Sequence, residues 1–266
     1  MNRPRQRSTS LVVPLVGLLI VGIIGLVIAG ALAAIRNSAS LSAGSPQPPG
    51  MRAGALTTEH PPLADGADLE TWPTADLPDP TWVIRTSELT GVPERALRAY
   101  AGAAMRNQEV NPRCELSWNT LAGIGRIESF HGVINDNTLS EDGTAEPGIF
   151  GIPLNGDGVA AIADTDGGEL DGDSEWDRAV GPMQFIPETW SRFGTDANGS
   201  GEANPQNIDD AALSAAFYLC DRGQGALSEA ENWVRAVRAY NNSSKYINDV
   251  AERANNYATS LAADPT

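Results

Sequence analysis

The residue best placed for acid–base chemistry is Glu128, in the stretch GIGRIESFHG (123–132). On a helix of 3.6 residues per turn, Leu121 and Ile124 lie about 20° and 40° from Glu128, so the carboxyl shares an apolar face. Burial disfavours the charged form of a carboxyl, raises its pKa and suits it to donate a proton near neutral pH. The alternative is a structural glutamate paired with Arg126 or another arginine, and helix position alone favours neither.

Helical periodicity predicts that the domain around Glu128 is predominantly α-helical, because strand signals are sparse. The expected helices cover residues 93–108, 117–131 (ended by Gly132), 187–193, 207–220, 228–240 and 244–261. Ser228 and Glu231 have the spacing of a capping box at the start of the fifth helix.

The stretch Gly132–Asp177 differs from its surroundings, since it holds twelve acidic residues, many glycines and no lysine or arginine. Loops of this length in compact domains are usually functional or disordered. Apolar pieces such as GIFGIPL argue against disorder. We therefore expect an ordered acidic loop beside the site.

The N-terminal third predicts a tethered protein. Residues 11–35 contain no charged residue, and about 20 apolar residues are enough to span a bilayer. Arginines at positions 3, 5 and 7 predict that residues 1–10 are a cytoplasmic tail and that the rest lies outside the membrane. The alternative is a cleaved signal peptide and a secreted protein. Residues 36–80, rich in Ser, Gly and Pro, are expected to be a flexible stalk, and residues 81–262 the folded domain.

Composition excludes several functions. The net charge of −16 disfavours binding to nucleic acid. Lys245 is the only lysine, and it does not stand in a phosphate-binding GxxxxGK loop. The two histidines, His60 and His131, are too few for a multi-histidine zinc site, and a Ser-His-Asp hydrolase has little to be built from. The two cysteines, Cys114 and Cys220, are expected to form a disulfide, because the domain is predicted to be exported.

Two further motifs follow Glu128 in the chain. They are GPMQFIPETW (181–190) and AYNN (239–242). Singly, each has a purely structural explanation, as a proline-fixed turn and as a helix end. Together with Glu128-Ser129, in this order, they resemble the lytic transglycosylases, specifically the membrane-bound B type and its soluble relatives. The resemblance covers about residues 82–260.

The resemblance implies a lysozyme-like helical domain that cleaves peptidoglycan at the β-1,4 bond between N-acetylmuramic acid (MurNAc) and N-acetylglucosamine (GlcNAc). The product would be 1,6-anhydro-MurNAc, and no cofactor would be needed. It assigns Glu128 as the single acid that later acts as base. Ser129 would lie at the cleft edge, and the other substrate-binding residues would be Met183, Gln184, Phe185, Tyr240 and Asn241. With the predicted anchor, the location would be the outer face of a bacterial cell membrane.

Two alternatives stay open from the sequence. If Asp173 or Asp177 lies close enough to act as a second carboxylate, the enzyme would be a muramidase-type hydrolase that adds water. The other alternative is a non-catalytic module that binds peptidoglycan, although such a module would not need Glu128.

A calcium site is also expected at DANGSGEANPQN (196–207), where the resembling family carries an EF-hand-like loop. The ligand positions would be Asp196, Asn198, Ser200, the Glu202 carbonyl, Asn204 and Asn207. The twelfth position is Asn instead of the usual Glu, so binding would be weak. The alternative is a turn that has kept the shape of the loop without the ion.

Overall fold

The computed structural model describes residues 59–263. Their secondary structure is mainly helical, as predicted. In chain order the elements are η1 (Thr74–Asp76), α1 (Pro80–Thr90), α2 (Glu94–Val110), α3 (Trp118–Ser129), β1 (Thr138–Leu139), β2 (Ala145–Glu146), α4 (Pro187–Phe193), α5 (Ile208–Gly223), α6 (Ala230–Tyr240) and α7 (Ser244–Ala262).

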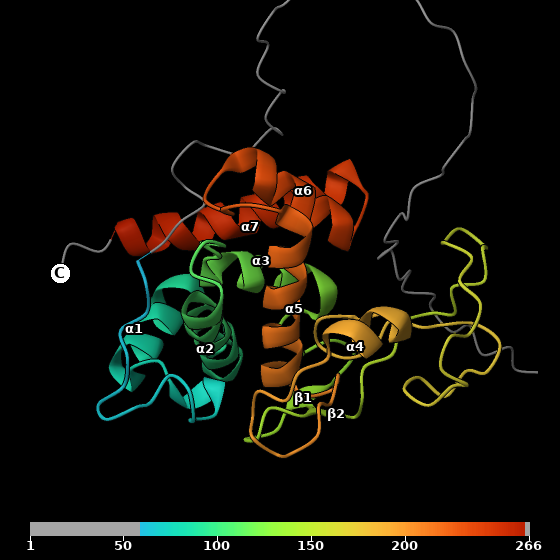
Figure 1. Ribbon diagram of the computed structural model, residues 1–266, viewed down its shortest axis with the longest axis horizontal. Coiled ribbons are helices and arrows are strands. Elements are labelled where there is room, and N and C mark those ends of the chain that lie inside the picture. Colours follow the sequence, from blue (N-terminus) through green and yellow to red (C-terminus); the bar gives the residue numbers. More distant parts are fainter. Residues whose placement is uncertain (1–58, 264–266) are drawn as a thin grey trace, which may run out of the picture.

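Helix α5 runs through the middle of the domain (Figure 1). In that view α1 and α2 lie on one side of it, α4 and the β1–β2 hairpin on the other, and α6 and α7 cross one end. Helix α2 packs on α5, and α3 packs on α7. Large, fully buried side chains fill the core between the helices, among them Trp118, Trp233, Tyr100, Leu121 and Met183.

Small residues let the central helices approach closely. The buried face of α2 includes Ala96, Ala99 and Ala103, and α5 is similarly rich in buried alanine. At Gly125 of α3, an added Cβ would lie 2.0 Å from the hydroxyl of Tyr100 on α2. Glycine is therefore required where α3 crosses α2, and this contact fixes the helix that carries Glu128.

The predicted helices are observed, with boundaries that differ by a few residues. Helix α6 begins two residues later than predicted, at Ala230, with Glu229 as its N-cap and no side-chain capping bond. The predicted capping box is therefore wrong: the hydroxyl of Ser228 donates to the carboxylate of Glu115 instead.

The prediction that a flexible stalk reaches residue 80 is wrong for residues 62–80. The amides of Asp79 and Ala64 donate to the carbonyls of Pro62 and Leu77, both at 2.8 Å, and Leu77 is fully buried. Helix α1, which the sequence analysis missed, follows directly. Its N-cap Asp79 accepts a hydrogen bond from Trp82 N, and a proline stands in its first turn.

The predicted tail (1–10), the predicted anchor (11–35) and residues 36–58 of the predicted stalk lie outside the described residues. Between residues 59 and 263, none of the helices has the length and apolar character needed to cross a bilayer.

The predicted disulfide is present. Cys114 and Cys220 are bonded, with their Cα atoms 5.5 Å apart and a sequence separation of 106 positions. The bond ties the segment before α3 to the last turns of α5. Neither cysteine lines the cavity around Glu128, so the role of the bond is structural.

The acidic loop is ordered, as predicted, because its carboxylates accept hydrogen bonds from its own backbone. Asp164 accepts from the amides of Gly167 and Gly168, and Asp171 from that of Arg178 at 2.6 Å. These bonds close successive turns in the part of the loop that follows the β1–β2 hairpin. The loop thus reaches the GPMQF turn in a defined conformation.

Candidate active site

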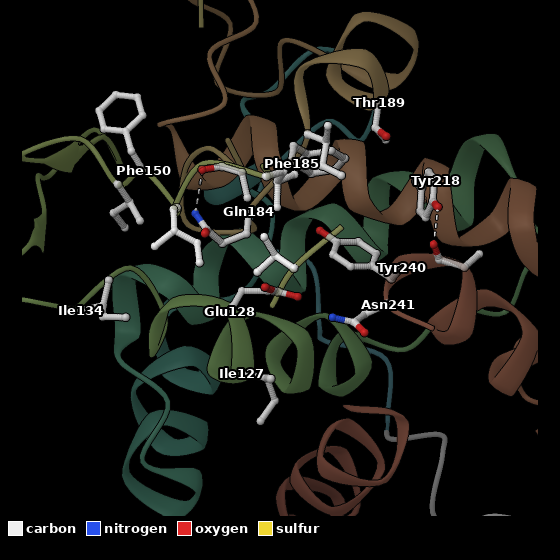
Figure 2. A pocket seen from close by; sticks show the side chains of 18 of the residues that line it. Ile127, Glu128, Ile134, Phe150, Gln184, Phe185, Thr189, Tyr218, Tyr240 and Asn241 are labelled. Atoms are coloured by element: carbon white, nitrogen blue, oxygen red, sulfur yellow. Dashed lines mark hydrogen bonds between the residues drawn. The ribbon is translucent and has the colours of Figure 1, made fainter. Parts of the chain in front are cut away.

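Glu128 lies in the last turn of α3, partly buried, and faces a cavity of about 460 Å³. In Figure 2, Glu128 lies in the middle of the site, with Phe150 and Tyr218 toward opposite ends. The cavity walls come from α3, from residues 149–159 of the acidic loop, from the GPMQF turn and from the α6–α7 junction. Segments far apart in sequence therefore meet around one carboxyl group.

An unusual helix end holds Glu128 in place. Phe130, His131 and Gly132 have φ values of 54°, 67° and 82°, so three successive residues are left-handed. The amide of His131 donates to Gly125 O at 2.9 Å. Its buried ring lies between the hydroxyls of Tyr100 and Tyr257, at 3.2 and 3.3 Å. Burial lowers the pKa of His131 to about 3, so the ring is neutral and anchors the end of α3.

The environment of Glu128 favours its protonated form. Burial raises the pKa of this carboxyl from 4.5 to about 7, although the hydrogen bond from Tyr246 opposes the rise. The Tyr246 hydroxyl donates to Oε1 of Glu128 at 2.5 Å. Between residues 59 and 263, no arginine forms a salt bridge with Glu128; Arg126 instead lies over the ring of Phe130, 4.2 Å from its centroid. The structure therefore disfavours the ion-paired, purely structural glutamate.

Four of the predicted substrate-binding residues line the cavity: Gln184, Phe185, Tyr240 and Asn241. Gln184 has a φ of 52°, and its Nε2 donates to Gly181 O at 2.9 Å, which fixes the turn. The hydroxyl of Tyr240 donates to Met183 O at 2.7 Å. Tyr240 thus joins the end of α6 to the GPMQF turn.

Two predicted positions do not line the cavity, so those predictions are wrong. Met183 is fully buried in the core. Ser129 is also fully buried: its Oγ donates to Pro182 O at 2.6 Å and accepts from the amide of Gly132 at 2.7 Å. The bond from Ser129 to Pro182 O joins the end of α3 to the GPMQF turn, which explains the place of Ser129 in its motif.

Neither proposed second carboxylate lines the cavity. Asp177 is fully buried and accepts hydrogen bonds from the amide and hydroxyl of Thr165. Asp173 forms a salt bridge with Arg178 at 2.9 Å. Glu128 is the only carboxylate among the residues that form the cavity.

Several residues of the site were not predicted from the sequence. Tyr246 lies in the first turn of α7, and it ends the stretch AYNNSSKY (239–246) that contains the third motif. A tyrosine one turn into the helix after AYNN was the available signal. Tyr218 of α5 and the apolar residues of segment 149–159 gave no local signal, because only the tertiary fold brings them to Glu128.

In the loop predicted to bind calcium, backbone amides donate hydrogen bonds to side-chain oxygens of the predicted ligands. Both carboxylate oxygens of Asp196 accept backbone hydrogen bonds, from Gly199 and Gly201 among others. The side-chain oxygen of Asn207 caps α5 by accepting from the amides of Asp209 and Asp210. A calcium ion would have to share these oxygens with the amides, so the donor set is consistent with weak calcium binding at most.

A second acidic group lies in the acidic loop, where carboxylate oxygens of Asp164, Asp166 and Asp177 are within 4.8 Å of one another. These carboxylates also accept hydrogen bonds from their own loop. Their spacing is accounted for by the turns they close.

The second and third motifs lie in a segment of the chain that matches a known protein family. Residues 161–261 match the family described as Transglycosylase SLT domain. The match includes GPMQFIPETW and AYNN and begins after Glu128. It confirms the resemblance to the lytic transglycosylases, whose lysozyme-like fold is consistent with the helical domain, and it supports peptidoglycan transglycosylase activity in general. Comparisons with curated proteins and with solved structures gave no match.

Proposed function

We propose that the protein is a lytic transglycosylase that cleaves the MurNAc-β-1,4-GlcNAc bond of peptidoglycan and forms 1,6-anhydro-MurNAc. One observation carries the proposal: a single carboxylate lines the cavity, and its burial raises its pKa to about 7. A general acid works best when its pKa is near the working pH. Glu128 therefore has the properties of a proton donor without a second carboxylate as partner.

In the proposed reaction, protonated Glu128 donates its proton to the glycosidic oxygen as the C1–O bond breaks. The acetamido oxygen of the muramyl sugar stabilises the developing positive charge, as in substrate-assisted glycosidases. The Glu128 carboxylate then takes the proton of the C6 hydroxyl, and that oxygen bonds to C1. The proton lost in the first step is recovered in the second, and no water is consumed.

Two neighbours support these roles. Tyr246 donates to Oε1 of Glu128, which leaves Oε2 as the oxygen for proton transfer. Asn241, which lines the cavity beside Tyr240, carries an amide that can hydrogen-bond the N-acetyl group. Gln184 and Phe185 would contact the glycan from the facing turn.

The muramidase-type hydrolase is the second candidate for the same site. In its two-carboxylate form this hydrolase needs a second carboxylate beside Glu128, and neither Asp173 nor Asp177 lines the cavity. A non-catalytic binding module has no use for a desolvated acid. The arrangement therefore supports the transglycosylase over a two-carboxylate hydrolase and over a binding module.

Replacing Glu128 with Gln tests the proposal, because the amide keeps the shape of the side chain but has no transferable proton. Release of soluble fragments from purified peptidoglycan should fall by at least about 10²-fold. Asp173→Asn is the matched control, since it also neutralises a carboxylate but lies outside the cavity, and it should retain activity. Near-normal cleavage by Glu128→Gln would contradict the proposal.

We also propose that residues 11–35 anchor the protein in the membrane, with residues 1–10 in the cytoplasm and the enzymatic domain outside. The support is the length and composition of the uncharged stretch. Membrane fractionation with mass measurement of the N-terminus tests it. A soluble, N-terminally shortened protein would indicate signal cleavage instead.

A further inference from the structure

One wall of the cavity is apolar and partly exposed. It consists of Ile149, Phe150, Gly151, Ile152, Leu154 and Val159, together with Ala179. Within this wall, Ile149 and Leu154 are buried, whereas Phe150 and Ile152 are 50% and 64% exposed. Phe150 and Ile152 therefore present apolar surface to solvent at the edge of the cavity that Glu128 faces.

The wall is held firmly although it belongs to a long loop. The amides of Gly151 and Leu154 donate to Ala179 O and Asp177 O, at 2.8 and 3.0 Å. The side chain of Gln206 brackets Ile149, accepting from its amide and donating to its carbonyl, at 2.8 and 2.9 Å. The exposure of the two apolar side chains is thus a fixed feature of the backbone. Apolar side chains that line a cavity are typical of ligand-binding sites.

The surroundings of the wall are negative or neutral. None of the residues that form the cavity is a lysine, arginine or histidine, and Glu128 is the only acidic one. The acidic loop that supplies the wall carries twelve acidic residues and no lysine or arginine. Among the described residues, Arg178 is a cation that contacts the wall, because its side chain donates a hydrogen bond to Gly151 O. Its charge is already paired with that of Asp173. A carboxylate brought to this wall would lose water without gaining a cation.

A peptide stem placed against this wall could have one of two chemical forms. The muramyl sugar carries a lactyl group and a peptide stem, whose side-chain carboxyls are either free or amidated. Methyl groups of the N-acetyl, lactyl and alanyl parts fit an apolar wall. A free carboxylate does not, because burial of an unpaired charge is costly and the acidic loop repels it.

We infer that Phe150 and Ile152 form a specificity wall that selects glycan strands with neutral, amidated peptide stems over strands with free stem carboxylates. The inference rests on the proposed function for its substrate class. It specifies that the cavity prefers the amidated form of that substrate and that Phe150 and Ile152 determine this preference.

The test compares two soluble glycan–peptide substrates that differ only in amidation of the stem carboxyls. At low ionic strength, the full-length protein should have a kcat/KM at least about tenfold higher for the amidated substrate. The Phe150→Ser, Ile152→Ser double variant makes the wall polar, so this ratio should fall toward one. Val110→Ser is the matched control: Val110 is 54% exposed at the end of α2, away from the cavity, and its substitution should leave the ratio unchanged.

The outcomes separate the inference from the proposed function. Equal kcat/KM values for the two substrates, or an unchanged ratio in the double variant, would overturn the inference while leaving the reaction intact. If neither substrate is cleaved, the proposed reaction is contradicted. The preference is then measured as the ratio of the two dissociation constants, which should show the same tenfold difference and the same loss in the double variant. Equal dissociation constants would overturn the inference.

Discussion

The hydroxyl of Tyr246 donates a hydrogen bond of 2.5 Å to Oε1 of Glu128. The two residues are 118 positions apart in sequence and come from α7 and α3, which pack against each other. The bond stabilises the ionised carboxylate and opposes the effect of burial on its pKa. It therefore sets both the direction in which Glu128 points and the pH at which it holds its proton.

Replacing Tyr246 with Phe removes this bond and leaves the ring. The pKa of Glu128 should rise further, because burial is then unopposed, and the alkaline limb of kcat/KM should move up by about one pH unit. The turnover number should fall as well, since the carboxyl loses its orientation. The pH profile is the decisive measurement, because a purely structural tyrosine would lower activity without moving the limb.

The raised pKa of Glu128 also predicts how stability depends on pH. Between pH 4.5 and about 7 the folded protein holds a proton that the unfolded chain has lost. The free energy of unfolding should therefore fall as pH rises through this window, by up to about 3 kcal/mol, and the effect should end above about pH 7. Glu128→Gln lacks this contribution.

Urea denaturation of both proteins at several pH values measures the difference. The stability of Glu128→Gln relative to the natural sequence should increase from pH 4.5 to 7 and then level off. Curves that stay parallel across this window would show that the carboxyl is not desolvated in solution.

The Cys114–Cys220 disulfide should contribute stability and not activity. In the chain-entropy model, a loop of 106 residues corresponds to roughly 4–5 kcal/mol. The Cys114→Ser, Cys220→Ser variant should therefore melt at a clearly lower temperature, yet cleave peptidoglycan normally where it is folded. Thiol labelling of the native, unreduced protein should find no free cysteine, and stoichiometric labelling of both would contradict the bond.

Calcium should bind weakly if it binds at the loop 196–207. Asp196 is the only charged side chain among the predicted side-chain ligands, and its oxygens already accept amides, so we expect dissociation constants of about 10⁻⁴–10⁻³ M. Millimolar calcium should then raise the melting temperature slightly relative to chelator, and Asp196→Ala should abolish the shift. Identical melting curves would leave the loop as an ion-free turn.

The position of Glu128 could be predicted because it depends on local periodicity alone. Ser129 and Met183 could not be placed in the same way, since a motif shows which residues stand together and not which way they point. At Gln184 the left-handed backbone turns neighbouring side chains to different sides, so Gln184 faces the cavity while Met183 is buried.

The wall of the cavity could not be predicted, because pairings across long sequence separations form it. Gly151 pairs with Ala179, and Ile149 with Gln206, which is 57 residues away. Helix α1 was missed for a different reason. The proline- and aspartate-rich composition before it was interpreted as a stalk, whereas Asp79 and Pro80 start a helix.

The most direct test of the central claim is the chemical identity of the product. Peptidoglycan digested by the full-length protein in H₂¹⁸O should yield muropeptides that end in 1,6-anhydro-MurNAc and carry no ¹⁸O, because the C6 hydroxyl and not water closes on C1. New reducing MurNAc ends, in excess of those in undigested peptidoglycan kept in the same H₂¹⁸O, would contradict the claim and establish a hydrolase.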